Sequence, residues 1–130
     1  MTLGFIGFGE VGYEMAQGFA GAGLTGILAY DVLQDHPVFG KLVSDRAQAA
    51  GVALCATPQA LLSAADVVIV AVPGGKALET ACVQKSLLRP GILYADVSAS
   101  SQEIKKQIWE ALKETGISFV DGAMLGSLPL

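Results

Sequence analysis

Short apolar runs of strand length alternate with segments of helical periodicity along the whole chain. We predict strands at residues 2–7, 26–30, 52–55, 66–72, 92–95 and 117–120. The segment 66–72, DVVIVAV, is the clearest of them, because β-branched residues fill it and polar side chains are nearly absent. Continuous apolar runs of this kind are typical of a parallel sheet that is covered on both faces.

Helical patterns separate these strands. We predict helices at residues 11–22, 37–50, 58–64, 76–87 and 102–115. Thr57 followed by Pro58 is typical of a helix start, with a hydroxyl N-cap and proline at the first helical position. Ser100 with Glu103 three residues later predicts a capping box before the last helix.

Six strands joined by helices of this length predict one α/β domain over residues 1–130. The expected architecture is a doubly wound parallel sheet with right-handed crossovers, a Rossmann fold. A chain of 130 residues suits one domain with one core and is too short for two. No internal repeat, low-complexity tract or linker interrupts the pattern.

The turn after the first strand carries a motif with chemical meaning. It matches G-x-G-x-x-G and consists of Gly7, Phe8, Gly9, Glu10, Val11 and Gly12. The first glycine permits a tight turn, the second lets a pyrophosphate approach the backbone, and the third lets the helix pack closely on the strand. The motif follows a predicted strand and opens a predicted helix, which is the context that dinucleotide binding requires.

Asp31 closes the second predicted strand, 19 residues after Gly12. A carboxylate at this spacing is expected to accept hydrogen bonds from the adenosine ribose and to repel a 2′-phosphate. No Arg or Lys follows Asp31 before Lys41, so we expect NAD to be favoured over NADP. The start of the predicted helix at residues 11–22, which the glycine motif opens, offers free N–H groups to the diphosphate. The alternative is a glycine-rich turn and a surface aspartate that bind no ligand.

Composition and charge narrow the possible partners. The chain is 52% hydrophobic and 15% charged, and its net charge is −4. Its eight Lys and Arg residues are scattered and form no basic stripe, so we expect no nucleic-acid partner. No apolar run approaches the roughly 18 residues of a membrane span, and no basic residue precedes the N-terminal apolar stretch. We therefore expect neither a membrane segment nor a signal peptide.

The two cysteines, Cys55 and Cys82, lack CxxC or metal-site spacing and stand in apolar stretches. This pattern predicts buried free thiols in a reducing cytoplasm.

The opening sequence GFIGFGEVG resembles the N terminus of the β-hydroxyacid dehydrogenase family, which includes 3-hydroxyisobutyrate and 6-phosphogluconate dehydrogenases. The resemblance covers nearly the whole chain. Residues 71–73, AVP, stand where the family places a loop against the cofactor. Residues 96–100, DVSAS, stand at its Asp-x-Ser-Thr-like segment, and residues 121–127, DGAMLGS, align with its substrate motif D-A-P-V-S-G-G.

This resemblance implies hydride transfer between a nicotinamide cofactor and a small hydroxyacid, alcohol or imine. It places Val72 and Pro73 beside the nicotinamide. It places the substrate beside Ser98, Asp121, Gly122, Ala123 and Gly126. Ala123 and Leu125 replace the proline and serine of the substrate motif, so the resemblance does not fix the substrate.

The family's general acid/base lysine belongs to a second, all-helical domain, and this sequence ends before that region. We expect residues 1–130 to be a cofactor-binding half that is inactive alone and forms homo-oligomers through the missing domain or its apolar surface. Most lysines of the chain are expected to be solvated, and Lys76, just after the Gly-Gly turn, is the only candidate among them for an approach to the cofactor: Lys41, Lys76, Lys85, Lys105, Lys106 and Lys113. The alternatives are a stand-alone NAD(H)-binding or sensing module and, third, a Rossmann domain for S-adenosylmethionine.

Several of these residues also have a purely structural interpretation. Ser98 can bond the following helix start, and Gly122 and Gly126 can serve turn conformations. We expect Asp96 to cap the following helix and Asp121 to organise its loop. No His or Glu accompanies the two carboxylates at ligand spacing, so we expect no metal site.

Overall fold

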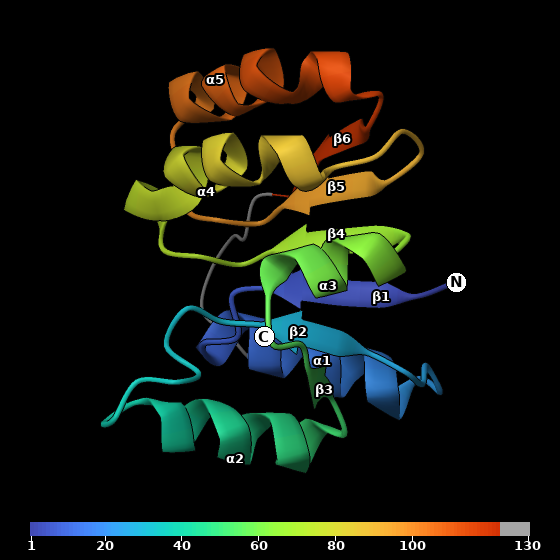
Figure 1. Cartoon of the computed structure of the whole chain (residues 1–130), viewed down its shortest axis with the longest axis vertical. Coiled ribbons are helices and arrows are strands. Elements are labelled where there is room, and N and C mark those ends of the chain that lie inside the picture. Colours follow the sequence, from blue (N-terminus) through green and yellow to red (C-terminus); the bar gives the residue numbers. More distant parts are fainter. Residues whose placement is uncertain (123–130) are drawn as a thin grey trace.

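The computed structural model describes residues 1–122, in which six strands form one parallel sheet (Figure 1). The strands are β1 (Leu3–Ile6), β2 (Leu28–Tyr30), β3 (Ala53–Leu54), β4 (Val67–Val70), β5 (Leu93–Asp96) and β6 (Ser118–Asp121). Their order is β3-β2-β1-β4-β5-β6, and every neighbouring pair is parallel. This is the doubly wound Rossmann arrangement that the sequence predicts.

Helices connect consecutive strands. They are α1 (Glu10–Gly21), α2 (Gly40–Ala50), α3 (Pro58–Ala64), α4 (Ala77–Gln84) and α5 (Gln102–Leu112), with short 3-10 segments η1 (Gly74–Lys76), η2 (Lys85–Leu87) and η3 (Lys113–Thr115). Helix α3 begins at the predicted cap, where Thr57 Oγ1 accepts a hydrogen bond from the Ala60 N–H at 3.1 Å. Within residues 1–122, no helix has both the length and the apolar character that a bilayer crossing requires.

The start of α5 differs from the prediction by one residue. Ser101 is its N-cap and accepts a hydrogen bond from the Ile104 N–H at 3.2 Å. The predicted capping box of Ser100 and Glu103 is therefore wrong, and so is the expectation that the aspartate at the end of β5 caps this helix. The Ser100 hydroxyl instead donates to the Gly74 carbonyl at 3.1 Å, which links the loop after β5 to the loop after β4.

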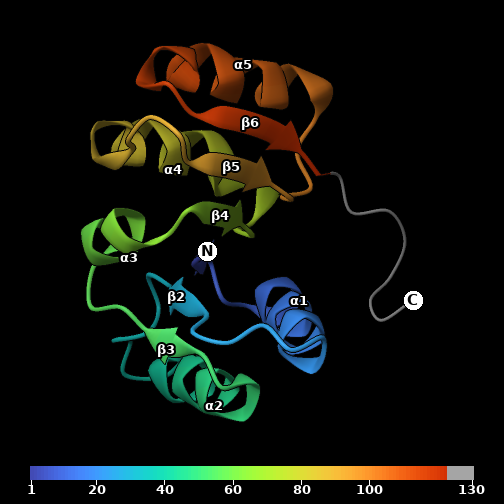
Figure 2. The same cartoon turned by 90° about the vertical axis from the view of Figure 1, so that its right-hand side faces the viewer.

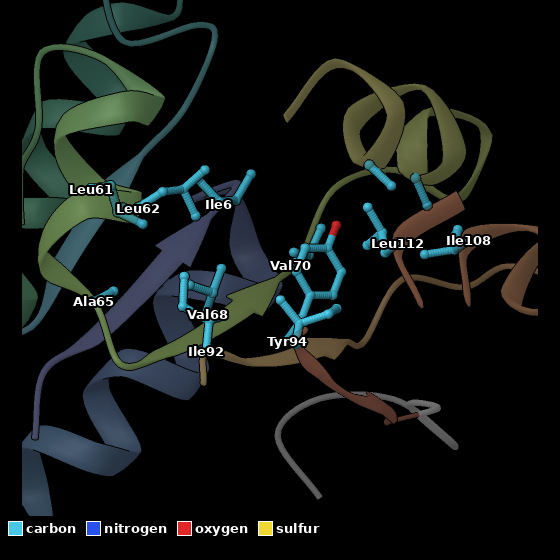
Figure 3. Packing of buried hydrophobic residues seen from close by; sticks show 13 residues of the cluster. Ile6, Leu61, Leu62, Ala65, Val68, Val70, Ile92, Tyr94, Ile108 and Leu112 are labelled. Atoms are coloured by element: carbon cyan, nitrogen blue, oxygen red, sulfur yellow. The ribbon is translucent and has the colours of Figure 1, made fainter. Parts of the chain in front are cut away.

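Apolar side chains bury both faces of the sheet. Helices α3, α4 and α5 cover one face, with a core that includes Leu61, Val68, Val70, Ala81, Ile108 and Leu112 (Figure 3). Helices α1 and α2 cover the other face, with a core that includes Phe5, Phe8, Ala16, Ala29, Ala47 and Ile69. Figure 2 shows α3 and α4 on one side of the sheet and α1 on the other. Because both faces are buried, the strands read as continuous apolar runs.

The two thiols differ in their surroundings. Cys55 is partly buried, and this burial raises the pKa of its thiol. Cys82 is exposed, so the expectation that both thiols are buried is wrong for this residue. It lies on the outer side of α4, whose buried side is formed by Ala77, Ala81 and Gln84.

Tyr94 places a polar group inside the larger core. Its side chain is fully buried, and Figure 3 shows its ring between Val70 and Leu112. The hydroxyl has no hydrogen-bond partner among the described residues. Burial, with a smaller contribution from the negative charge of Asp96, raises the pKa of this hydroxyl above its ordinary value. A buried hydroxyl without a partner costs free energy.

We expect Tyr94→Phe to raise the free energy of unfolding by about 1 kcal/mol at neutral pH, because it removes this unpartnered group and keeps the ring. The raised pKa means that the folded protein keeps a proton that the unfolded chain loses above about pH 10. Wild-type stability should therefore fall as the pH rises past that value, and the variant should lack this part of the fall. Urea unfolding at a series of pH values measures both effects.

Tyr13→Phe is the matched control, because Tyr13 is partly buried and its hydroxyl accepts a hydrogen bond from Gln17 at 2.9 Å. This variant should keep the alkaline loss that Tyr94 causes. A Tyr94→Phe protein that is less stable than wild type at neutral pH would contradict the assignment of an unpartnered hydroxyl.

Candidate cofactor-binding site

The loop between β1 and α1 lies where the winding of the sheet reverses. Strand β1 pairs with β2 on one side and with β4 on the other, and the helices that follow these strands cover opposite faces. In open parallel sheets, ligands bind at the carboxyl ends of the strands beside such a reversal. Residues 7–12 therefore lie at the expected ligand site of this fold.

The three glycines of the loop meet different surroundings. Gly7 has φ +92°, and a Cβ atom there would lie 2.5 Å from the Ala71 carbonyl oxygen. A Cβ atom at Gly12 would lie 2.6 Å from the Gly7 carbonyl oxygen. A Cβ atom at Gly9 would meet nothing within 4 Å. The fold itself thus requires glycine at positions 7 and 12, whereas Gly9 borders open space.

The backbone of this loop faces outward while its largest side chain faces the core. The Phe8 ring is fully buried and meets the rings of Phe5 and Tyr13 edge to face, at centroid distances of 6.2 and 6.3 Å. Gly9 is the N-cap of α1, and no side chain caps the N–H groups of the first turn. Those groups carry a partial positive charge and can donate to an anion. Val11 is half-buried, and Glu10 is exposed in the same turn.

Asp31 is bonded directly to the glycine loop. Its Oδ2 accepts a hydrogen bond from the Phe8 N–H at 2.7 Å, and its Oδ1 accepts one from the Leu33 N–H at 2.8 Å. The carboxylate therefore ties the end of β2 to the loop after β1. An ionised carboxylate has about four acceptor positions, so Asp31 retains acceptors for a ribose hydroxyl.

The loop after β4 lies against the glycine loop. The two segments are in close contact, because a Cβ atom added at Gly7 would lie only 3.0 Å from Val72 Cγ1. Val72 is half-buried, and Pro73 is exposed. The side chain of Lys76 is also exposed and forms a surface ion pair with Glu79 of α4 at 3.5 Å. Lys76 is thus solvated, as expected for most lysines of the chain, and the ion pair gives no support to its candidacy as a cofactor contact.

Lys105 is the main departure from the sequence prediction. It is only 5% exposed, so the expectation of a solvated side chain is wrong at this position, whereas the other five lysines are exposed. Its ammonium donates to the Asp96 carbonyl oxygen at 2.8 Å and to Asp96 Oδ1 at 2.9 Å, and it lies 3.2 Å from Asp121 Oδ1. These contacts match the three donors of an ammonium group.

The sheet explains why a cation is buried here. Asp96 and Asp121 are register partners at the ends of β5 and β6, so two negative charges stand on neighbouring strands. The Lys105 ammonium lies within reach of both carboxylates and offsets their repulsion. A signal for its burial was present in the sequence, because position 105 shares a helix face with Ile108 and Leu112.

The substrate residues implied by the family resemblance gather around Asp96. Ser98 is 4% exposed, and both its N–H, at 2.8 Å, and its hydroxyl donate to Asp96 Oδ1. The Gly122 N–H donates to the Asp96 carbonyl oxygen at 2.9 Å, beside Asp121. The Ser98 hydroxyl is thus engaged within the protein. The remaining predicted residues, Ala123 and Gly126, lie outside the described part of the chain.

A shallow hollow of about 440 Å³ lies along α5 and β6, on the side of Lys105 and Asp121. It is lined by Gln102, Glu103, Lys105, Lys106, Trp109, Phe119 and Asp121. The hollow shares no residue with the glycine loop, so it does not mark the predicted cofactor site.

Comparison with known proteins identifies relatives of the whole chain. The family described as the NAD binding domain of 6-phosphogluconate dehydrogenase matches residues 2–128. A conserved hypothetical protein from Sinorhizobium meliloti 1021 is 27% identical with a TM-score of 0.89, covering 99% of this chain and 43% of that one. Mycobacterium tuberculosis 3-hydroxyisobutyrate dehydrogenase with L-serine is 25% identical with a TM-score of 0.75, covering 91% and 38%.

An imine reductase from Myxococcus stipitatus in complex with NADP⁺ shares the fold, with 22% identity and a TM-score of 0.80. The match covers 98% of this chain and 42% of the reductase. The chain thus spans about two fifths of the length of each of these solved structures.

The glycine geometry generates a stability prediction. Gly7→Ala and Gly12→Ala should each lower the free energy of unfolding by about 1–3 kcal/mol, because the added methyl group meets a backbone carbonyl and, at Gly7, a positive φ. Gly9→Ala should change it by less than about 0.5 kcal/mol, since its surroundings are open. Chemical denaturation of the three variants tests this order. Equal losses at all three positions would contradict the distinction.

Proposed function

The chain belongs to the family of the NAD binding domain of 6-phosphogluconate dehydrogenase, and from this premise we propose that residues 7–12 and Asp31 bind NAD in preference to NADP. The observation that carries the proposal is the open space at Gly9 beside the uncapped start of α1. The fold explains the other two glycines of the motif by internal contacts, whereas the absence of a side chain at Gly9 leaves room for a diphosphate at the N–H groups.

The preference for NAD rests on the charges around Asp31. Its carboxylate lies beside the glycine loop and can accept hydrogen bonds from the ribose hydroxyls, whereas a 2′-phosphate there would meet a like charge. Lys41, the first cation after Asp31 in the sequence, is exposed and pairs with Asp45 at 3.0 Å. No other Lys or Arg stands between residues 31 and 46 to receive a phosphate.

For the whole protein we propose hydride transfer between a nicotinamide and a small hydroxyacid, alcohol or imine. The cofactor supplies or accepts the hydride. Val72 and Pro73 would border the nicotinamide, since their loop lies against the glycine loop. The substrate would lie near Ser98, Asp121, Gly122, Ala123 and Gly126. We place the proton-transferring group outside the described residues, because Lys105, the one buried lysine, is fully engaged.

The direct test is a fluorescence titration of the chain with NADH and, separately, with NADPH. Saturable binding that is tighter for NADH supports the proposal. Tighter binding of NADPH would keep the site and overturn the cofactor preference. Binding of neither, together with binding of S-adenosylmethionine, would assign the loop to another ligand.

We expect Gly9→Ala to raise the Kd for NADH by about tenfold or more, because the methyl group occupies the space proposed for the diphosphate. The melting temperature should stay close to that of wild type. Gly18→Ala is the matched control: this glycine is exposed on the same helix, and a Cβ atom there meets nothing within 4 Å. An unchanged NADH affinity in Gly9→Ala would remove the diphosphate from this loop.

Asp31→Asn should lower the ratio of NADH to NADPH affinity by about tenfold, because it removes the charge that repels a 2′-phosphate. The ratio is the informative quantity, since Asn has one acceptor oxygen for the two N–H groups of Phe8 and Leu33 and both affinities should decrease. Asp35→Asn, an exposed aspartate of the same loop, removes the same charge as a control. A preserved ratio in Asp31→Asn would show that another group selects the cofactor.

A further inference from the structure

A chain of close polar contacts joins α5 to the loop after β4. The Lys105 ammonium and the Ser98 hydroxyl both donate to Asp96 Oδ1. The Ser100 hydroxyl donates its one proton to the Gly74 carbonyl at 3.1 Å. The Ser98 and Ser100 hydroxyl oxygens lie 2.9 Å apart, a packing contact that joins the two serines. We call this chain, from Lys105 through Asp96, Ser98 and Ser100 to Gly74, the Lys105 network.

One end of the Lys105 network lies next to the candidate cofactor site. Gly74 directly follows Val72 and Pro73, the residues proposed to border the nicotinamide. A Cβ atom at Gly74 would clash with the Ala99 carbonyl oxygen, so the loops after β4 and β5 are in close contact. The position of the loop after β4 therefore depends on the loop after β5, and the Ser100 hydrogen bond fixes one to the other.

The other end of the network depends on the Lys105 ammonium. Asp96 is fully buried, and all three donors to its carboxylate meet Oδ1: the Ser98 N–H, the Ser98 hydroxyl and Lys105. Its Oδ2 has no partner among the described residues. Lys105 supplies the counter-charge and also bonds the Asp96 carbonyl and Asp121, so it holds the ends of β5 and β6 together. Without the ammonium, Asp96 would be a buried charge held only by Ser98.

We propose that Lys105 is a positioning residue for the nicotinamide end of the bound dinucleotide. It orients the Asp96 carboxylate, which orients Ser98 and Ser100, and these hold the loop that contains Val72 and Pro73. This inference rests on the proposed function, because it requires the dinucleotide to lie across the glycine loop and the loop after β4.

The test must separate positioning from the cost of a buried unpaired charge. Lys105→Met alone leaves Asp96 uncompensated and can unfold the chain. Lys105→Met/Asp96→Asn removes both charges and keeps an amide oxygen for the Ser98 N–H, so its melting temperature should recover toward that of wild type. Ser100→Ala cuts the network at its far end without changing any charge. Lys106→Met is the matched control, since this neighbouring lysine is exposed.

A comparison of two ligands distinguishes effects at the nicotinamide end of the site from effects at the adenosine and diphosphate end. NADH carries the nicotinamide ring, whereas ADP-ribose carries the adenosine, the diphosphate and the second ribose and lacks only that ring. We expect Lys105→Met/Asp96→Asn and Ser100→Ala to raise the Kd for NADH by about three- to tenfold, the equivalent of one lost hydrogen bond. The Kd for ADP-ribose should change by less than about twofold, and Lys106→Met should change neither. Isothermal titration calorimetry gives both constants.

Three outcomes would overturn this inference and leave the proposed function unaffected. The first is an equal loss of affinity for both ligands in the network variants, which indicates a purely structural role. The second is an unchanged NADH affinity in both network variants. The third is an equal affinity of the wild-type chain for NADH and ADP-ribose, which means that the nicotinamide makes no contact that could be positioned. Failure of the wild-type chain to bind NADH would overturn the proposed function, and the inference with it.

Discussion

A parallel sheet that is buried on both faces leaves only its edges and strand ends for polar chemistry, and this constraint organises the molecule. Helices cover the two faces, so the strands carry almost no functional groups along their length. The polar residues appear where the chain leaves the sheet: Asp31 after β2, Asp96 at the end of β5 and Asp121 at the end of β6. Because parallel strands all end at one edge, residues far apart in sequence gather there.

Two groups of residues lie at this edge, and they have different structural roles. Around residues 7–12 the backbone is crowded: the absence of a side chain at Gly7 lets the loop pass close to Ala71 after β4, and its absence at Gly12 lets α1 pack on the Gly7 carbonyl. Around Asp96 and Asp121 the sheet brings like charges together, and a buried ammonium compensates them. The loop after β4 touches both groups, since it approaches Gly7 on one side and accepts the Ser100 hydrogen bond on the other.

The sequence predicted the features that depend on local signals. Every strand and helix was located to within three residues, because apolar runs, caps and turn glycines lie close together in the chain. The places of the glycine turn between β1 and α1 and of Asp31 after β2 were predicted for the same reason, and their binding of a cofactor stays a prediction. The cap of α5 was misplaced by one position, since Ser100 and Ser101 are equally suited to it by type.

The features that the sequence did not reveal depend on contacts between distant segments. Burial of Lys105 requires the register that sets Asp96 beside Asp121, and this register is a property of the assembled sheet. The bond from the Phe8 N–H to Asp31 joins residues 23 positions apart and follows from the pairing of β1 with β2. The helical period places position 105 on the buried face of α5 but does not reveal the partners of its ammonium, and the bond to Asp31 leaves no periodic signal.

The bond between Asp31 and Phe8 also limits how this protein could evolve or be engineered toward a different nucleotide. One carboxylate both faces the proposed ribose position and closes the loop, so replacing it alters recognition and loop geometry together. A change of cofactor preference therefore needs two coordinated substitutions. One introduces a group that binds the added phosphate, and the other supplies a separate acceptor for the Phe8 N–H. A single substitution at Asp31 that alters the cofactor preference would also remove a hydrogen bond that holds the binding loop.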